Sequence, residues 1–155
     1  MTALAAWHDV HAEGCDVNES LPPIRVTDQD WRRLTSLLTT PRGRCTPEVR
    51  ALLDEELARA EVVPAHAVHP NVVTMNSRVR FELGDGGRAI ERTLVYPWDA
   101  DPSTGHLSVL SPLGSVLLGL TVGDVFHWAN TDGSSVQVRV LVVVYQPEAE
   151  GDWSL

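Results

Sequence analysis

Apolar residues recur at helical spacing in two segments, residues 27–38 and 46–63. Each segment begins with a threonine that can cap a helix, and in the second a proline takes the first helical position. A turn that reads TTPRGRC, residues 39–45, separates them. Two adjacent helices with facing apolar stripes and a short connection predict an antiparallel helical hairpin over residues 24–63.

From Asn71 onward the apolar pattern changes from helical spacing to alternation. Val79, Phe81 and Leu83 are expected to face one way, and the charged residues between them the other. A Gly-Asp-Gly-Gly turn at 84–87 connects this run to the next. Further strands are predicted at residues 90–96, 106–110, 125–129 and 136–145. The pattern predicts a mostly antiparallel sheet, and with the hairpin an α+β fold.

The last predicted strand is apolar on both sides. The valines at every second position from 138 to 144 are expected to line one face, while Leu141 and Val143 make the other face apolar. A strand with two apolar faces is typical of a central position or of cover by a helix.

One short helix interrupts the strands, in the stretch SVLSPLGSVLLGLTVGD at 108–124. Ser111 is suited to cap this helix and Pro112 to take its first position. An apolar stripe then follows at Leu113, Val116, Leu117 and Leu120. The segment therefore predicts a strand, a tightly capped corner, a core helix and a turn.

The chain has 155 residues, which suits one domain with a small appendage. The pattern divides it into a flexible N-terminal tail at 1–23, the hairpin at 24–63, a linker at 64–70 and a sheet domain at 71–155. The N-terminus lacks the features of a signal peptide, and no apolar run is long enough for a membrane span. We therefore expect a cytoplasmic monomer without a membrane partner.

The formal net charge of −9 opposes direct, sequence-specific binding to DNA or RNA, because the phosphate backbone repels an acidic protein. A protein partner with basic patches fits the charge better, and plain solubility explains it equally well.

Several groups have the chemistry of metal ligands, but their spacing is loose. They are His8 and His11 with Cys15, His66 with His69, and Asp99 and Asp101 with Asp124. Cys45, beside Arg44, is a candidate reactive thiol, and an exposed structural cysteine is the simpler interpretation. The sequence contains no phosphate-binding loop, dinucleotide fingerprint or nucleophile elbow, so we expect no cofactor, no metal and no enzymatic activity.

Three runs together identify a family. NVVTMNSRVRFEL, RTLVYPWDADPSTGHLSVLSPLGSVLLGLTVGDVFHW and VLVVVYQPEAEGDW resemble the Rnk family, the regulators of nucleoside diphosphate kinase and relatives of the Gre transcript-cleavage factors. The resemblance implies an FKBP-like C-terminal domain behind a short coiled-coil hairpin. It also implies that the partner is RNA polymerase, bound near the rim of its secondary channel.

In Gre-type factors the C-terminal domain docks through the loop that here contains Leu110, Ser111, Pro112, Leu113 and Gly114. The resemblance therefore implies that these residues contact the polymerase. The alternative is that Ser-Pro merely begins a core helix.

The hairpin determines which kind of factor is expected. Gre factors carry acidic residues at the hairpin tip, which help to hold a second Mg²⁺ in the polymerase active site. Here the tip carries Arg42 and Arg44 instead, and a first helix over 28–38 spans only about 16 Å. The arginines are candidates for contacts with acidic or phosphate groups, or are simply exposed turn residues.

The resemblance, together with these features of the hairpin, implies a non-catalytic regulator that binds RNA polymerase and competes with Gre factors without stimulating RNA cleavage. The first alternative is a peptidyl-prolyl isomerase, which an FKBP-like fold permits but which needs an aromatic-lined pocket. The second is a cleavage stimulator despite the short tip.

Overall fold

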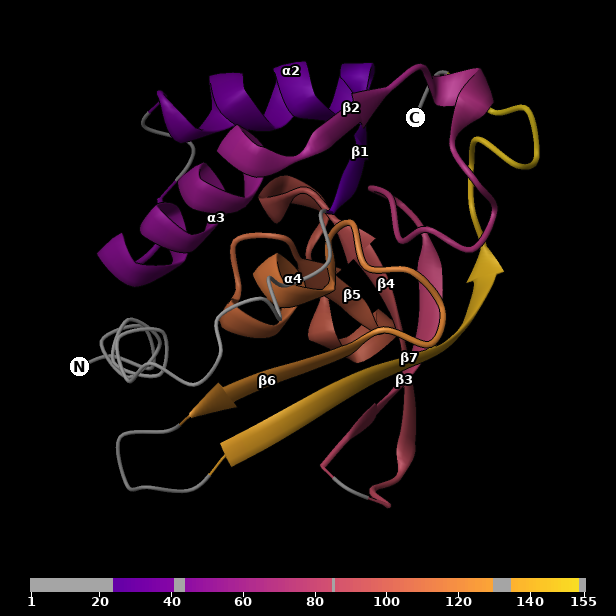
Figure 1. Ribbon diagram of the computed structural model, residues 1–155. Helices are drawn as coiled ribbons and strands as arrows, with labels where there is room; N and C mark the ends of the chain where they lie inside the picture. Colours follow the sequence, from indigo (N-terminus) through magenta and orange to yellow (C-terminus); the bar gives the residue numbers. More distant parts are fainter. Residues whose placement is uncertain (1–23, 41–43, 85, 130–134, 154–155) are drawn as a thin grey trace, which may run out of the picture.

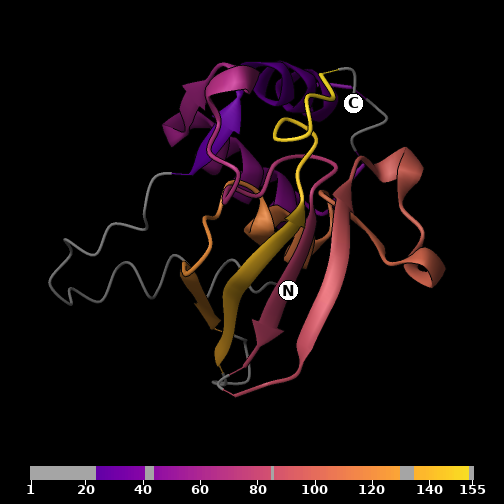
Figure 2. The same cartoon turned by 90° about the vertical axis from the view of Figure 1, so that its right-hand side faces the viewer.

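The computed structural model describes residues 24–40, 44–84, 86–129 and 135–153. A helical hairpin lies at one end of a five-stranded sheet, and a short helix packs against that sheet (Figure 1). The view turned by 90° shows the strands running away from the hairpin (Figure 2). The α+β class predicted from the sequence is confirmed. The FKBP-like architecture and the coiled-coil hairpin stay predictions.

The hairpin consists of two helices, α2 (Asp28–Leu38) and α3 (Pro47–Arg59). The threonine caps predicted for both are confirmed. The Thr27 hydroxyl accepts a hydrogen bond from the Asp30 backbone N–H at 3.1 Å, and the Thr46 hydroxyl accepts one from the Val49 N–H at 3.3 Å. These bonds satisfy N–H groups that have no partner inside the helix.

Two short strands hold the base of the hairpin together. β1 (Arg25–Thr27) precedes α2, β2 (Glu61–Val63) follows α3, and the two pair in parallel. The side chains of one register pair also interact, since the Arg25 guanidinium donates to the Glu61 carboxylate at 3.1 Å. The expectation that the second helix extends to residue 63 is therefore wrong. It ends at Arg59, because the next residues are extended and pair with β1.

The main sheet has the strand order β5-β4-β3-β7-β6. Its strands are β3 (Arg78–Leu83), β4 (Ala89–Val95), β5 (His106–Ser108), β6 (Val125–Ala129) and β7 (Ser135–Tyr145). Neighbouring strands are antiparallel except β4 and β5. The remaining elements are η1 (Ala65–Ala67), η2 (Pro97–Asp99), η3 (Pro102–Thr104) and α4 (Pro112–Leu117).

Strand β7 confirms one expectation and corrects another. It lies between β3 and β6, so its predicted central position is confirmed. Its valines do not share one face, however. Val138 and Val140 are buried, whereas Val142 and Val144 are each 40% exposed. The register against β3 shifts beside Leu141, and an additional residue in one strand reverses the alternation beyond it.

One continuous hydrophobic core joins the hairpin to the sheet domain. Leu34 of α2 and Leu53 of α3 belong to the same buried cluster as Phe81 of the sheet. The turn after α4 contributes a close contact, since a Cβ on Gly119 would lie 2.5 Å from the Cβ of Ile24. Gly119 also has φ +79°, a conformation that favours glycine. The hairpin therefore packs on the body of the molecule.

Candidate functional site

The corner before α4 is held by short hydrogen bonds. The Ser111 hydroxyl donates to the Ser108 carbonyl oxygen at 2.6 Å and accepts from the Gly114 N–H at 3.0 Å. The Ser108 hydroxyl accepts from the Leu110 N–H at 3.0 Å. Pro112 takes the first helical position, where no N–H is needed. The predicted cap and proline position are thus both confirmed, and the corner is rigid.

The five residues implicated in docking differ in exposure. Pro112 is exposed, Ser111 and Leu113 are half-buried, and Leu110 and Gly114 are buried. A ligand that approaches the corner would therefore meet the proline ring and the edges of its two neighbours. Leu110 and Gly114 support this surface from below.

Gly114 is required by the packing of the corner. A Cβ at this position would lie 2.0 Å from the Ser108 carbonyl oxygen, which is far inside van der Waals contact. Because the obstructing atom is backbone, no rotation of a side chain relieves the clash. Any other residue at 114 would distort the corner.

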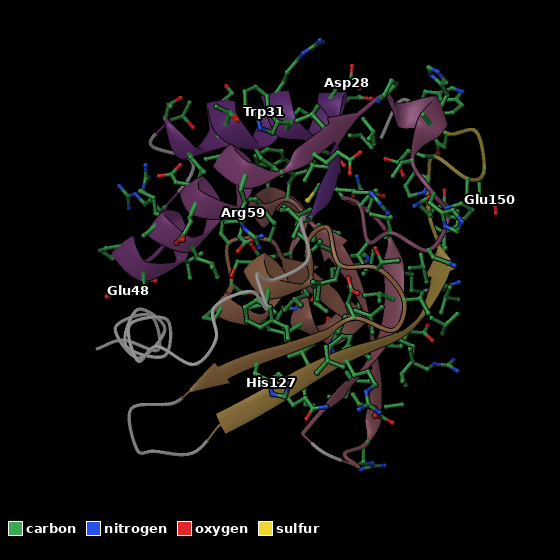
Figure 3. The ribbon with its side chains drawn as sticks, in the orientation of Figure 1. Asp28, Trp31, Glu48, Arg59, His127 and Glu150 are labelled. Atoms are coloured by element: carbon green, nitrogen blue, oxygen red, sulfur yellow. The ribbon has the colours of Figure 1, made fainter. Side chains whose placement is uncertain are left out.

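The connection between α2 and α3 is the second implicated region. Arg44 is exposed, Cys45 is half-buried against the core, and Arg42 lies outside the described residues. Glu48 lies on the first turn of α3, with its side chain at the connection end of the helix (Figure 3). This carboxylate lies close to the tip and was not counted in the sequence-based description. The acidic residues in the middle of α3 lie about 10 Å further along the helix.

The hairpin does not form a projecting stalk. Its helices run in opposite directions, and α3 runs obliquely to α2 and packs against α4 (Figure 1). Apolar residues of both helices are buried in the common core. With 11 residues, α2 spans about 16 Å, most of it above the body of the molecule.

A buried polar cluster, which we call the joint, connects the hairpin to the sheet domain. It comprises Asp30, Thr74, Met75, Ser77, Tyr96 and Glu148. Asp30 of α2 is 3% exposed. One carboxylate oxygen accepts from the Met75 backbone N–H at 3.1 Å, and the other accepts from the Tyr96 hydroxyl at 3.4 Å. A single carboxylate thus bridges the first helix and two segments of the sheet domain.

The second half of the joint ties the C-terminal segment to the same place. The Thr74 hydroxyl donates to Glu148 at 2.7 Å and lies 2.8 Å from the Ser77 hydroxyl. Nearby, the Gln146 amide donates to the carbonyl oxygens of His69 and Val72 at 2.9 and 2.8 Å. The stretch before β3 is therefore fixed from the hairpin side and from the C-terminal side.

Burial changes the acidity of the joint. Desolvation raises the pKa of Asp30 to about 6, against partial compensation by the hydrogen bond from Met75. Desolvation also raises the pKa of Tyr96 and of Glu148. The Asp30 charge is thus costly to bury and titrates in a range that an exposed aspartate does not reach.

The joint was missed because residues 71–77 were interpreted as part of a strand. The strand begins at Arg78, and the preceding residues form a turn with Asn76 at φ +63°. The available signal was the run of polar residues, Thr74, Asn76 and Ser77, within an apolar stretch. Asparagine tolerates the left-handed conformation better than most residues.

The metal-ligand candidates do not come together where the structure describes them. His69 is exposed and its ring accepts from the Asn71 N–H, Asp101 caps η3, and Asp124 accepts from the Thr121 N–H. The set at His8, His11 and Cys15 lies outside the described residues. Across the described ranges, no group of three or more His, Cys, Asp or Glu side chains is arranged to hold a metal.

A shallow depression lies between α3, α4 and β6. It is lined mainly by aliphatic side chains, with Glu56 and Arg59 at its polar edge and Phe126 as its one aromatic residue. Glu56 is buried and forms an ion pair with Arg59. This lining differs from the aromatic pocket that a peptidyl-prolyl isomerase would need.

Within the described part of the chain, no helix has the length and apolarity to cross a membrane.

Comparison with known proteins accounts for both parts of the molecule. Residues 68–145 match the family described as transcription elongation factor GreA/GreB, C-terminal, and residues 22–63 match the Rnk N-terminus. Over 136 residues the chain is 43% identical to the regulator of nucleoside diphosphate kinase of Escherichia coli strain K12, covering 88% of this chain and 99% of that protein. The chain belongs to the Rnk family.

More distant relatives share the sheet domain. A GreA transcription elongation factor of Halalkalibacterium halodurans is 31% identical over 91 residues, which cover 59% of this chain and 57% of that protein. A solved structure, described as a GreA/GreB transcription elongation factor from Nitrosomonas europaea, superposes with a TM-score of 0.65 at 43% identity. It covers 80% of this chain and 99% of that one.

The family resemblance inferred from the sequence is confirmed. The mixed fold, with its five-stranded sheet and few helices, is similar to the GreA/GreB structure. These relatives are named regulators and transcription factors rather than catalysts. Sequence and fold together are those of a transcription-factor-like regulator.

Proposed function

We propose that this protein is a non-catalytic transcription regulator of the Rnk type that binds RNA polymerase at the rim of the secondary channel. It docks through the corner at 110–114 and competes with Gre factors without stimulating RNA cleavage. The family and fold of Gre-related regulators support this proposal. The single observation that carries the docking site is the exposed Pro112 at a corner held by the Ser111 cap.

The geometry of the corner favours docking. Pro112 is exposed, while the serine cap and the buried Gly114 hold the backbone around it. A surface that is already ordered loses little conformational entropy on binding. The half-buried Leu113 adds apolar area beside the proline. Such a small, rigid, partly apolar surface fits a shallow site on a partner protein.

The hairpin favours binding without cleavage. Metal-assisted cleavage needs carboxylates that reach the metal, and Mg²⁺ prefers several oxygen ligands. The hairpin here is short and packed on the body, and Glu48 is the one carboxylate near the described part of its tip. Arg44 is exposed beside it. In the proposed complex, Arg42 and Arg44 contact acidic or phosphate groups of the channel.

A competition experiment tests the docking site. Purified core RNA polymerase is bound to a labelled Gre factor and titrated with wild-type protein, Pro112→Asp or Pro102→Asp. Pro102 is the matched control, because it is also an exposed proline at the first position of a short helix. We expect wild type and Pro102→Asp to displace the Gre factor equally. Pro112→Asp should need at least about 10-fold more protein, since a buried charge at an interface is costly.

Two results would contradict this assignment. Equal competition by all three proteins would show that the corner does not contact the polymerase. Failure of the wild type to compete would show that the protein does not share the polymerase site of Gre factors.

A separate assay tests catalysis, with backtracked elongation complexes incubated with the protein. We expect no release of short RNA, and a release would show that the protein is a cleavage stimulator.

A further inference from the structure

Two tryptophans stand out on the surface. Among the described residues, Trp98 is 61% exposed and Trp153 is 49% exposed, more than any other large apolar side chain. Trp98 lies in η2, in the loop after β4, and Trp153 lies in the segment after β7. In Figure 2, both the η2 loop and the C-terminal segment lie near the hairpin end of the sheet. Tryptophan is among the side chains most often found at the energetic centre of interfaces.

Trp98 is held in place by the ring below it. Its indole stacks on Tyr96 with 5.1 Å between ring centroids and 5° between planes. Tyr96 is 4% exposed and its hydroxyl donates to Asp30 of the joint. One face of the indole is therefore covered by an anchored ring, while most of the rest faces solvent. This makes Trp98 a preorganised aromatic platform.

Trp153 is connected to this platform through α2. With its amide oriented to satisfy both neighbours, Gln29 donates to the Trp153 carbonyl oxygen at 3.2 Å and accepts from the Arg33 guanidinium. The Arg33 guanidinium in turn lies close enough to Tyr96 to lower the pKa of its hydroxyl, against the larger effect of burial. Together with the stacking of Trp98 on Tyr96, four successive contacts thus link the two tryptophans across one turn of α2.

Acidic side chains lie close to the two tryptophans in the sequence. Those in the η2–η3 loop and the C-terminal segment are Asp99, Asp101, Glu150 and Asp152. Hydrogen bonds from Ser103 lower the pKa of Asp101, which keeps this carboxylate charged. The contacts described above place one cation, Arg33, between the two tryptophans. The surface therefore combines open aromatic area with net negative charge.

We propose that this surface, formed by Trp98 on its buried Tyr96 support, by Trp153 and by the neighbouring carboxylates, binds an arginine-bearing basic segment of a protein partner. A guanidinium stacks on the open face of the indole and pairs with carboxylates at the same time. Lysine lacks the planar group that the first contact uses. The site includes none of the corner residues 110–114, although β4 and β5, which lead to the two sites, lie side by side.

Other occupants fit less well. An anionic membrane surface or nucleic acid would be repelled by these carboxylates and by the net charge of −9. A second copy of the chain would bring the same acidic surface against itself if the contact were two-fold symmetric. Charge complementarity thus selects a basic partner.

Two peptides test the proposal. One is a fluorescent 12-residue peptide of alternating Arg and Gly, and the other has Lys in place of every Arg. We expect the wild type to bind the Arg peptide at least about 5-fold more tightly than the Lys peptide, because both carry the same charge but only one stacks. Trp98→Ala should remove this preference, and Asp99→Asn should weaken both peptides.

Matched controls separate a site from general attraction. Val142→Ala removes an exposed apolar side chain elsewhere, and Asp54→Asn removes an exposed charge from α3. Both should change affinity less than about 2-fold, as expected for positions outside the site. Equal affinity for the two peptides, or an Arg preference that survives Trp98→Ala, would overturn the proposal. So would sedimentation showing a dimer that Trp98→Ala abolishes, since the occupant would then be a second copy.

Discussion

Replacing Asp30 with asparagine tests the joint between the hairpin and the sheet domain. The pKa of Asp30 is raised from 3.8 to about 6, mainly because burial disfavours the charged form. Below about pH 3 the carboxyl is mostly neutral in both the folded and the unfolded chain. As the pH rises from about 3 to 6 the unfolded chain ionises first, so the folded state loses stability. Above pH 6 the loss is complete, and it amounts to about 3 kcal/mol.

Asparagine keeps the shape of Asp30 without the charge. Its oxygen can accept from the Met75 N–H, and its NH₂ can donate to the Tyr96 hydroxyl oxygen. We therefore expect Asp30→Asn to be more stable than the wild type, by up to about 1 kcal/mol at pH 4.5 and about 3 kcal/mol at pH 8. Hydrogen bonds to a neutral amide are weaker than those to a carboxylate, so these values are upper limits.

Urea unfolding followed by circular dichroism at pH 4.5, 6 and 8 measures the effect. Asp54→Asn is the control, because Asp54 is exposed on α3 and its replacement should change stability by less than about 0.5 kcal/mol. The decisive quantity is the difference between Asp30→Asn and wild type as the pH increases. If the variant is less stable than the wild type at pH 8, the hydrogen bonds of the joint more than offset the burial of the charge, and the reasoning is refuted.

Three further substitutions test the corner and the sheet surface. Gly114→Ala should destabilise the protein by at least about 2 kcal/mol in urea unfolding, because its Cβ would clash with the Ser108 carbonyl. Ser111→Ala should cost about 1 kcal/mol, lowering the thermal midpoint by roughly 3 °C, through loss of the cap; an unchanged midpoint would contradict this. Arg80→Ala breaks the half-exposed 3.0 Å ion pair with Glu91 and should change stability by less than about 0.5 kcal/mol at 150 mM salt. A larger loss would show that this pair is structurally important.

Local chemistry made much of the fold predictable. The start of each α-helix depends on a side chain and an N–H three residues apart, so Thr27, Thr46 and Ser111 mark these starts in the sequence. The hairpin connection between β3 and β4 follows from its glycines in the same way. Features of this kind need no knowledge of the rest of the chain.

Long-range pairing was not predictable in this way. The end of α3 depends on β1, which lies 36 residues away along the chain at the Arg25–Glu61 contact. The alternation in β7 depends on where a residue of β7 is left without a partner in β3. In the sequence Asp30 is one of two acids in the first turn of α2, and only the fold brings Tyr96 against it. The corner was predictable as a structure, whereas the docking role that we propose for it depends on the family resemblance.

The pairing of β1 with β2 has a consequence for how this architecture can vary. The two strands bring the start and the end of the hairpin together, in register, at one place on the body. Whole helical turns inserted equally into α2 and α3 would lengthen the hairpin. The β1–β2 pair at its base and the main sheet would keep their sequence and their pairing. The length of the hairpin can therefore change independently of the rest of the fold, through an insertion at the connection between α2 and α3.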